Sequence, residues 1–128
     1  MQPYEWAILR VVPRVERCEF VNAGVIVYCQ QLGFLEAGIA LDEGRARCLD
    51  PRLDLAAVSR HLAAVTELCA GAPTAGASGA RPPGDRFRWL VAPRSTVVQA
   101  SPVHTGLTTD PQADLQRLLD LMVRPLPG

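Results

Sequence analysis

Residues 4–12 restrict the fold more than any other segment, because they read Tyr-Glu-Trp-Ala-Ile-Leu-Arg-Val-Val and are almost entirely apolar. In a β-strand successive side chains point to opposite faces. One face of this segment carries Tyr4, Trp6 and Ile8, and the opposite face carries Ala7, Leu9 and Val11. A strand that is apolar on both faces is predicted to lie inside a sheet rather than at its edge. Pro13 ends it, because proline cannot donate to a β-ladder.

The connections that follow are short, which favours an antiparallel sheet, since a parallel crossover needs about a dozen residues or more. Further strands are expected at about 19–29, 34–41, 46–49, 86–92 and 95–100. Gly24 interrupts the first of these, which is otherwise β-branched and aromatic, and predicts a bulge or a close backbone approach. We therefore expect a mainly antiparallel sheet of about five to six strands.

Two helices are predicted from capping residues and apolar spacing. Asp54 can cap a helix that runs to about Ala70 and stops at Gly71. Its apolar stripe has spacings of three and four residues and consists of Leu55, Val58, Leu62, Val65 and Leu68. A second helix begins at Asp110-Pro111, with the aspartate as cap. The predicted class is α+β, with both helices packed on one face of the sheet.

The chain of 128 residues has the length of one domain, which we place at 1–128. Residues 71–84 consist of small residues and prolines and are expected to form a flexible loop. This loop does not predict a domain boundary, because neither flank can bury a separate core.

The charge balance excludes several functions. All thirteen basic residues are arginine, and thirteen acidic residues give a formal net charge of +0. The absence of lysine excludes Schiff-base chemistry and a phosphate loop that ends in Gly-Lys-Ser/Thr. A neutral chain lacks the positive field that non-specific nucleic-acid binding needs, so nucleic acid is not an expected partner. Neutrality also gives little protection against association, and a protein partner or a homodimer is expected instead.

The N-terminus lacks the pattern of a signal peptide, and no apolar run approaches the roughly 20 residues that span a bilayer. The four cysteines are far apart and form no C-x-x-C pair. They are Cys18, Cys29, Cys48 and Cys69. We therefore expect a cytoplasmic protein with reduced thiols, no membrane contact, no metal site and no cofactor.

A polar segment from Ser101 to Asp110 contains His104, one of two histidines. A histidine near hydroxyl groups can act as a general base that activates a nucleophile or water. One interpretation is therefore a small hydrolase or transferase that uses His104 with Ser95, Ser101 or Glu19. The other is that these groups satisfy a turn and a helix cap.

Arg94-Ser95-Thr96 is a candidate anion site, because a guanidinium and two hydroxyls can share a phosphate or carboxylate. Arg10, Arg14 and Arg17 could add charge to it, which would make the chain an anion-sensing domain; alternatively, all are solvated surface arginines. Glu19 and Asn22 break an apolar strand close to Gly24, as functional positions often do, although both could simply bind the preceding loop.

Three stretches resemble a bacterial family known as domain of unknown function 3037. They are Tyr4 to Pro13, the motif Glu19-Phe20-Val21-Asn22-Ala23-Gly24-Val25, and Arg86 to Leu107 with Arg94-Ser95, Gln99 and Ser101-Pro102-Val103-His104-Thr105-Gly106. The resemblance implies no reaction. It does imply a context, because similar proteins are often encoded beside a HipA-like protein of kinase fold, which would be a candidate partner.

The leading interpretation is a non-catalytic binding module or accessory subunit of such a kinase-fold protein. Its contact surface would use the sheet face that the helices leave uncovered. The expected binding residues are Arg10, Glu19, Asn22, Arg94, Ser95, Gln99 and His104.

Overall fold

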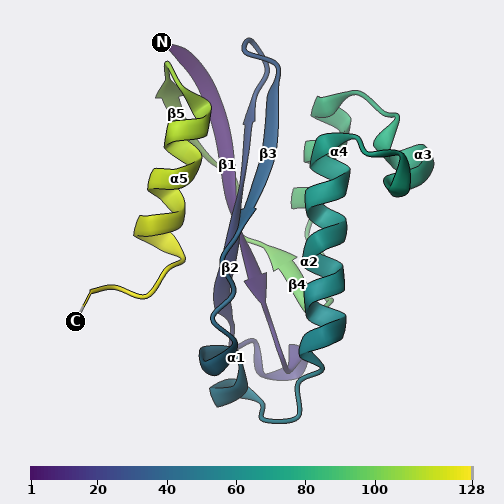
Figure 1. Cartoon of the computed structure of the whole chain (residues 1–128), viewed down its shortest axis with the longest axis vertical. Helices are drawn as coiled ribbons and strands as arrows, with labels where there is room; N and C mark the ends of the chain where they lie inside the picture. Colours follow the sequence, from purple (N-terminus) through teal and green to yellow (C-terminus); the bar gives the residue numbers. More distant parts are fainter. Residues whose placement is uncertain (128) are drawn as a thin grey trace.

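A computed structural model describes residues 1–127 and shows a five-stranded antiparallel sheet with helices on both faces (Figure 1). The strands are β1 (Gln2–Val11), β2 (Val21–Cys29), β3 (Phe34–Ile39), β4 (Val98–Ala100) and β5 (His104–Thr108). Their order is β3-β2-β1-β4, and β5 also pairs with β1. The predicted central position of residues 4–12 is therefore confirmed, because β1 has neighbours along both of its edges.

One edge of β1 pairs with β4 and β5 in succession, and Ser101 joins the two pairings. Leu9 lies opposite Ala100, whereas Trp6 lies opposite His104. The segment that joins β4 to β5 therefore carries one residue more than β1 between these two pairs. The Ser101 hydroxyl accepts a hydrogen bond from the Ile8 backbone N–H at 2.8 Å. The Ser101 N–H donates to the Ile8 carbonyl, also at 2.8 Å. Ser101 thus keeps β1 hydrogen-bonded where the ladder is interrupted by a bulge.

The helices are α1 (Glu43–Leu49), α2 (Leu55–Ala70), α3 (Gly76–Gly79), α4 (Pro83–Val91) and α5 (Pro111–Met122). Both predicted helices are confirmed with their caps, because Asp54 accepts from the Ala57 N–H and Asp110 from the Ala113 N–H. Gly71 ends α2 in the left-handed conformation at φ 67°.

Within the described residues, the structure contains no helix with the length and apolar character needed to cross a membrane.

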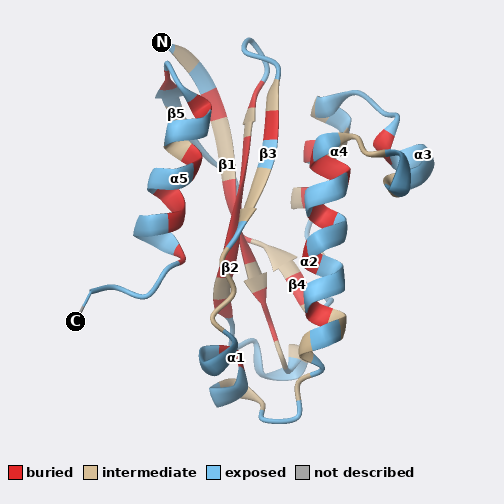
Figure 2. Cartoon of the chain, viewed as in Figure 1, coloured by how far each residue is buried: buried red, intermediate tan, exposed pale blue. Residues whose placement is uncertain are grey.

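The expectation that both helices cover one face is wrong, because α2 and α5 lie on opposite faces of the sheet (Figure 1). On one face α2 and α4 pack against residues such as Leu9 and Ile26. On the other face α5 packs against residues such as Val25 and Val27, which alternate with Ile26 along β2. Figure 2 shows the buried residues of α2 and α5 turned toward the sheet from both sides. Both faces of the central strands are apolar, so a helix layer on one side would leave the other in water.

Two expected strands are helical. Residues 46–49 belong to α1, whose N-cap is Asp42; the Asp42 carboxylate accepts a hydrogen bond from the Arg45 N–H. Residues 86–92 were expected to be extended but belong mostly to α4, where Phe87 and Leu90 are buried three residues apart on one side of the helix. In both segments the few apolar residues are compatible with either a strand or a helix. The capping aspartate of α1 and the proline in the first turn of α4 favour the helix.

Three other boundaries differ from expectation. The strand expected at 95–100 is the shorter β4, and the polar segment from Ser101 to Asp110, for which no strand is predicted, contains β5. Residues 71–84, expected to be a loop, form a 3-10 turn at Pro73–Ala75, the single turn of α3, and the start of α4. β5 lacks apolar alternation because it is an edge strand with exposed side chains, so the sequence pattern does not identify it.

The predicted irregularity at Gly24 is confirmed. The β1–β2 register shifts between Leu9 and Arg10, which lie opposite Gly24 and Asn22 and leave Ala23 as the extra residue. The backbone also approaches closely, because a Cβ on Gly24 would lie 2.5 Å from the Gly38 carbonyl oxygen of β3. Only glycine fits at this position of β2, between β1 and β3.

Cys69 is the last buried residue of α2, and Arg86 of α4 binds the C-terminus of this helix. The Arg86 guanidinium donates to the Leu68 and Cys69 carbonyl oxygens, each at 2.7 Å. These bonds satisfy carbonyl groups that have no partner within the helix. Burial raises the pKa of the Cys69 thiol to about 12, although the nearby Arg86 charge acts in the opposite direction.

We expect Gly24→Ala to lower the free energy of unfolding by about 1–3 kcal/mol, because its methyl group would overlap a backbone oxygen. Gly44→Ala is the matched control, since Gly44 lies in the first turn of α1 and its nearest neighbour would be 3.4 Å away. That control should be neutral or more stable by up to about 1 kcal/mol. Urea unfolding measures both, and equal stabilities would contradict the close approach.

We expect unfolding to become easier as pH rises from 9 toward about 12, because the Cys69 thiol then keeps its proton only in the folded chain. The unfolded chain binds fewer protons in this window, so the free energy of unfolding falls with rising pH. Cys69→Ala should show a shallower alkaline decline, measured by urea unfolding at several pH values. At pH 8 a thiol reagent should label the exposed Cys18 and Cys48 well before Cys69. Rapid labelling of Cys69 would contradict its burial.

Candidate functional site

A strip of side chains lies beside α5 on the same face of the sheet. We call it the α5-side strip, and it consists of Trp6, Arg10, Phe20, Asn22, Gln99 and His104. Arg10 lies opposite Asn22 in β2 and opposite Gln99 in β4, and cross-strand partners point to the same face. The Asn22 amide donates to the Met122 carbonyl at 2.9 Å, which places this face on the α5 side.

At one end of the strip, Trp6 of β1 stacks on His104 of β5. Their ring centroids are 4.4 Å apart and the planes are inclined by 26°. Trp6 is half-buried, whereas His104 is exposed. The imidazole therefore covers part of the indole and leaves its own outer surface open to solvent.

At the other end, Arg10 lies over the ring of Phe20, with its guanidinium carbon 4.1 Å from the ring centroid. Phe20 remains 43% exposed. Two side-chain atoms of these cross-strand partners are buried without a hydrogen-bond partner in the described residues, namely Arg10 Nε and Asn22 Oδ1. One is a donor and the other an acceptor, and an unsatisfied buried group costs about 1–3 kcal/mol.

The residues of the catalytic hypothesis lie in different surroundings. His104 is stacked on Trp6, while the Ser101 hydroxyl binds the Ile8 N–H and donates to the Pro102 carbonyl at 2.9 Å. Glu19 forms an ion pair with Arg17 at 2.5 Å. Ser95 lies on the segment between α4 and β4, beside a cavity next to α2. The structure therefore does not gather these side chains around His104.

The candidate anion cluster is also divided. Arg94 lines one cavity, whereas Ser95 and Thr96 line the neighbouring one, and the Thr96 hydroxyl donates to the Val98 carbonyl at 2.7 Å. Arg14 contacts Glu16 and Asp50, and Arg17 contacts Glu19, so neither adds charge beside Arg94. Among the described residues there is also no cluster of three or more His, Cys, Asp or Glu side chains suited to a metal ion.

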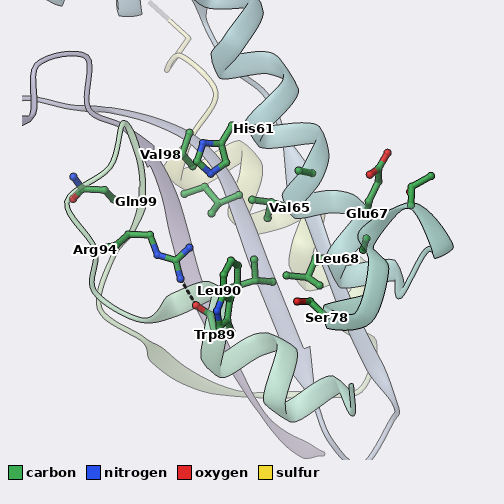
Figure 3. A pocket seen from close by; sticks show the side chains of 14 residues that line it. His61, Val65, Glu67, Leu68, Ser78, Trp89, Leu90, Arg94, Val98 and Gln99 are labelled. Atoms are coloured by element: carbon green, nitrogen blue, oxygen red, sulfur yellow. Dashed lines mark hydrogen bonds between the residues drawn. The ribbon is translucent and has the colours of Figure 1, made fainter. Parts of the chain in front are cut away.

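The cavity that Arg94 lines lies on the other face of the sheet, between α2, α3, α4 and β4, and has a volume of about 290 Å³ (Figure 3). Its floor is apolar, with Val65, Leu68 and Leu90. His61 and Trp89 also line it, and sequence reasoning missed their role. Trp89 belongs to a segment expected to be a strand, and the helical spacing of Phe87 and Leu90 is the signal that could have placed it.

The fold brings together the segments that contain the strip. β1 lies in the middle, with β2 on one side and β4 and β5 on the other, so Arg10 touches residues from both flanking segments. In this small α+β protein a helix-covered sheet thus presents a partly open polar and aromatic strip beside α5. The sequence profile of a family described as "Protein of unknown function (DUF3037)" matches residues 6–123, and the chain belongs to this family. Searches of curated proteins and of solved structures found no match.

We expect Ser101→Ala to lower the free energy of unfolding by about 1–3 kcal/mol, because it leaves the buried Ile8 N–H without a partner. Ser95→Ala is the matched control, since Ser95 is exposed, and its effect should lie within about 0.5 kcal/mol. Chemical unfolding of both variants provides the comparison. A normal stability for Ser101→Ala would show that the Ser101 hydroxyl is not needed to complete the ladder.

Proposed function

We propose that this protein is a non-catalytic binding module that acts as an accessory subunit and contacts a folded protein partner through the α5-side strip. The observation that carries the proposal is the row formed by Asn22, Arg10 and Gln99 across three neighbouring strands. All three are half-buried and lie on the part of the face next to α5.

The composition of the strip suits a protein partner better than a small molecule. Tryptophan, phenylalanine and arginine are enriched at the centres of protein interfaces, and the strip contains all three. Its residues belong to adjacent strands, except Phe20, which directly precedes β2, and they form a surface rather than a deep pocket. Exposed apolar side chains continue from it, with Val103 36% and Met122 38% exposed.

The two unpartnered atoms support an interface at the Arg10 end. A partner that presents a carbonyl oxygen and an N–H side by side would satisfy both Arg10 Nε and Asn22 Oδ1 after a small side-chain movement. Backbone amides and Asn or Gln side chains offer this pair of groups. The gain on binding would be concentrated there, as is common in protein interfaces.

The candidate partner is the HipA-like protein of kinase fold that the family resemblance implies, and we place the complex in the cytoplasm. The opposite positions of α2 and α5 narrow the proposed surface, because no whole face of the sheet is free. The strip beside α5 replaces the uncovered face as the contact region.

The test compares two strip variants with two control variants. Arg10→Met and His104→Ala change the strip, whereas Arg60→Met and Ser59→Ala change exposed positions of α2. The tagged protein is isolated from its source cells for native mass spectrometry, and the affinity of the purified kinase-fold protein is then measured by calorimetry. We expect the wild type and both α2 variants to form a stoichiometric complex, and the strip variants to bind at least tenfold more weakly.

Thermal unfolding of each variant shows whether its fold is retained, so that a loss of binding is not confused with a loss of structure. Equal binding by all variants would contradict the strip as the contact surface. A wild-type protein that binds no kinase-fold protein, and is isolated alone as a monomer or homodimer, would contradict the accessory-subunit proposal.

A further inference from the structure

The cavity lined by Arg94 lies on the α2 face of the sheet, and Gln99 is the one residue of the α5-side strip that also lines it. We propose that it binds a small amphipathic carboxylate, with the Arg94 guanidinium on the carboxylate group and the apolar floor around the rest of the molecule. The proposal rests on three properties of the site: a fixed and uncompensated cation, an apolar floor, and a suitable volume.

Arg94 is held in position by Trp89. Its guanidinium carbon lies 4.5 Å from the centroid of the indole ring, and one terminal nitrogen donates to the Trp89 carbonyl oxygen. Stacking and one hydrogen bond fix the plane of the guanidinium, while its other N–H groups remain available. A binding group that is already oriented loses little conformational entropy when a ligand arrives.

The charge of Arg94 is not neutralised inside the described part of the chain, where it has no carboxylate within ion-pair distance. Seven other arginines in this part of the chain have such a partner. They are Arg14, Arg17, Arg47, Arg81, Arg88, Arg117 and Arg124. Glu67 also lines the cavity, but Figure 3 shows its carboxylate pointing away from the centre. Arg94 is half-buried, so its field in the cavity is screened less than that of a fully exposed arginine.

The floor of the cavity selects for an apolar body. Val65 and Leu68 of α2 and Leu90 of α4 form it, and Figure 3 shows them between Arg94 and Ser78. The volume of about 290 Å³ lies at the lower end of the range for small-molecule sites. A single arginine fork matches one carboxylate, whereas a phosphate usually needs several donors, so a monocarboxylate fits this site better than a free phosphate.

The test uses phenylacetate and octanoate as probes, with phenylacetamide, phenethylamine and inorganic phosphate as comparisons. Binding is measured by calorimetry and by the chemical shift of the Trp89 indole N–H. We expect both carboxylates to bind and to move this signal. The amide and the amine should bind at least tenfold more weakly than phenylacetate, and phosphate should bind weakly or not at all.

Two variants separate the roles of charge and volume. Arg94→Met keeps an apolar side chain and removes the charge, whereas Ala64→Leu adds bulk at the edge of the cavity, and each should weaken phenylacetate binding at least tenfold. Arg60→Met is the matched control, because Arg60 lies on the exposed side of α2, and it should bind like the wild type. Thermal unfolding without ligand shows that each variant is folded.

The remaining outcomes overturn the proposal. If neither carboxylate binds, the cavity is not a site for this class of ligand. If phenylacetamide or phenethylamine binds as well as phenylacetate, or Arg94→Met binds like the wild type, Arg94 does not select an anion. If phosphate binds most tightly, the apolar floor does not contribute.

Discussion

The structure depends on the need to cover two apolar faces of the same central strands. β1 and β2 bury large apolar side chains on both sides, including Leu9 and Ile26 toward α2 and Val25 and Val27 toward α5. Burying apolar area is worth about 25 cal/mol per Å², so leaving either face in water would cost more than a small domain can lose. The separation of α2 and α5 to opposite faces follows from this requirement. It also divides the surface into two regions, with the strip on one face and the Arg94 cavity on the other.

Much of the fold could be predicted where capping residues and spacing agree. Asp54 with Gly71, and Asp110 with Pro111, define α2 and α5 because each cap is a local interaction encoded within a few residues. Gly24 could be identified as a bulge because glycine interrupts a β-branched segment. The position of β1 could be predicted because its pattern allows only an interior strand. These features do not require knowledge of distant contacts.

The remaining features depend on contacts that are distant in sequence. β5 is a strand because β1 supplies its partners, and its own exposed side chains carry no strand pattern. α4 is a helix whose buried Phe87 stacks on Tyr28 of β2, a contact that the sequence around Phe87 does not reveal. The same limit applies to the site. The residues Arg10, Asn22, Gln99 and His104 could each be selected from the sequence, but their position on one face follows from the register of three strand pairs. His61 and Arg94 line the same cavity because α4 packs against α2, which the sequence does not reveal.

The interruption between β4 and β5 also affects how the chain behaves at high concentration. Because Val97 and Ser101 bond to β1, the backbone groups of Val98 point away from the sheet, and its carbonyl is bound by the Thr96 hydroxyl at 2.7 Å. Pro102 follows Ser101 and has no N–H to donate to another strand. An edge that is short, bent and partly capped is a poor template for a strand from another molecule. At this edge the backbone geometry therefore disfavours strand pairing between copies, which a net charge of +0 does little to prevent.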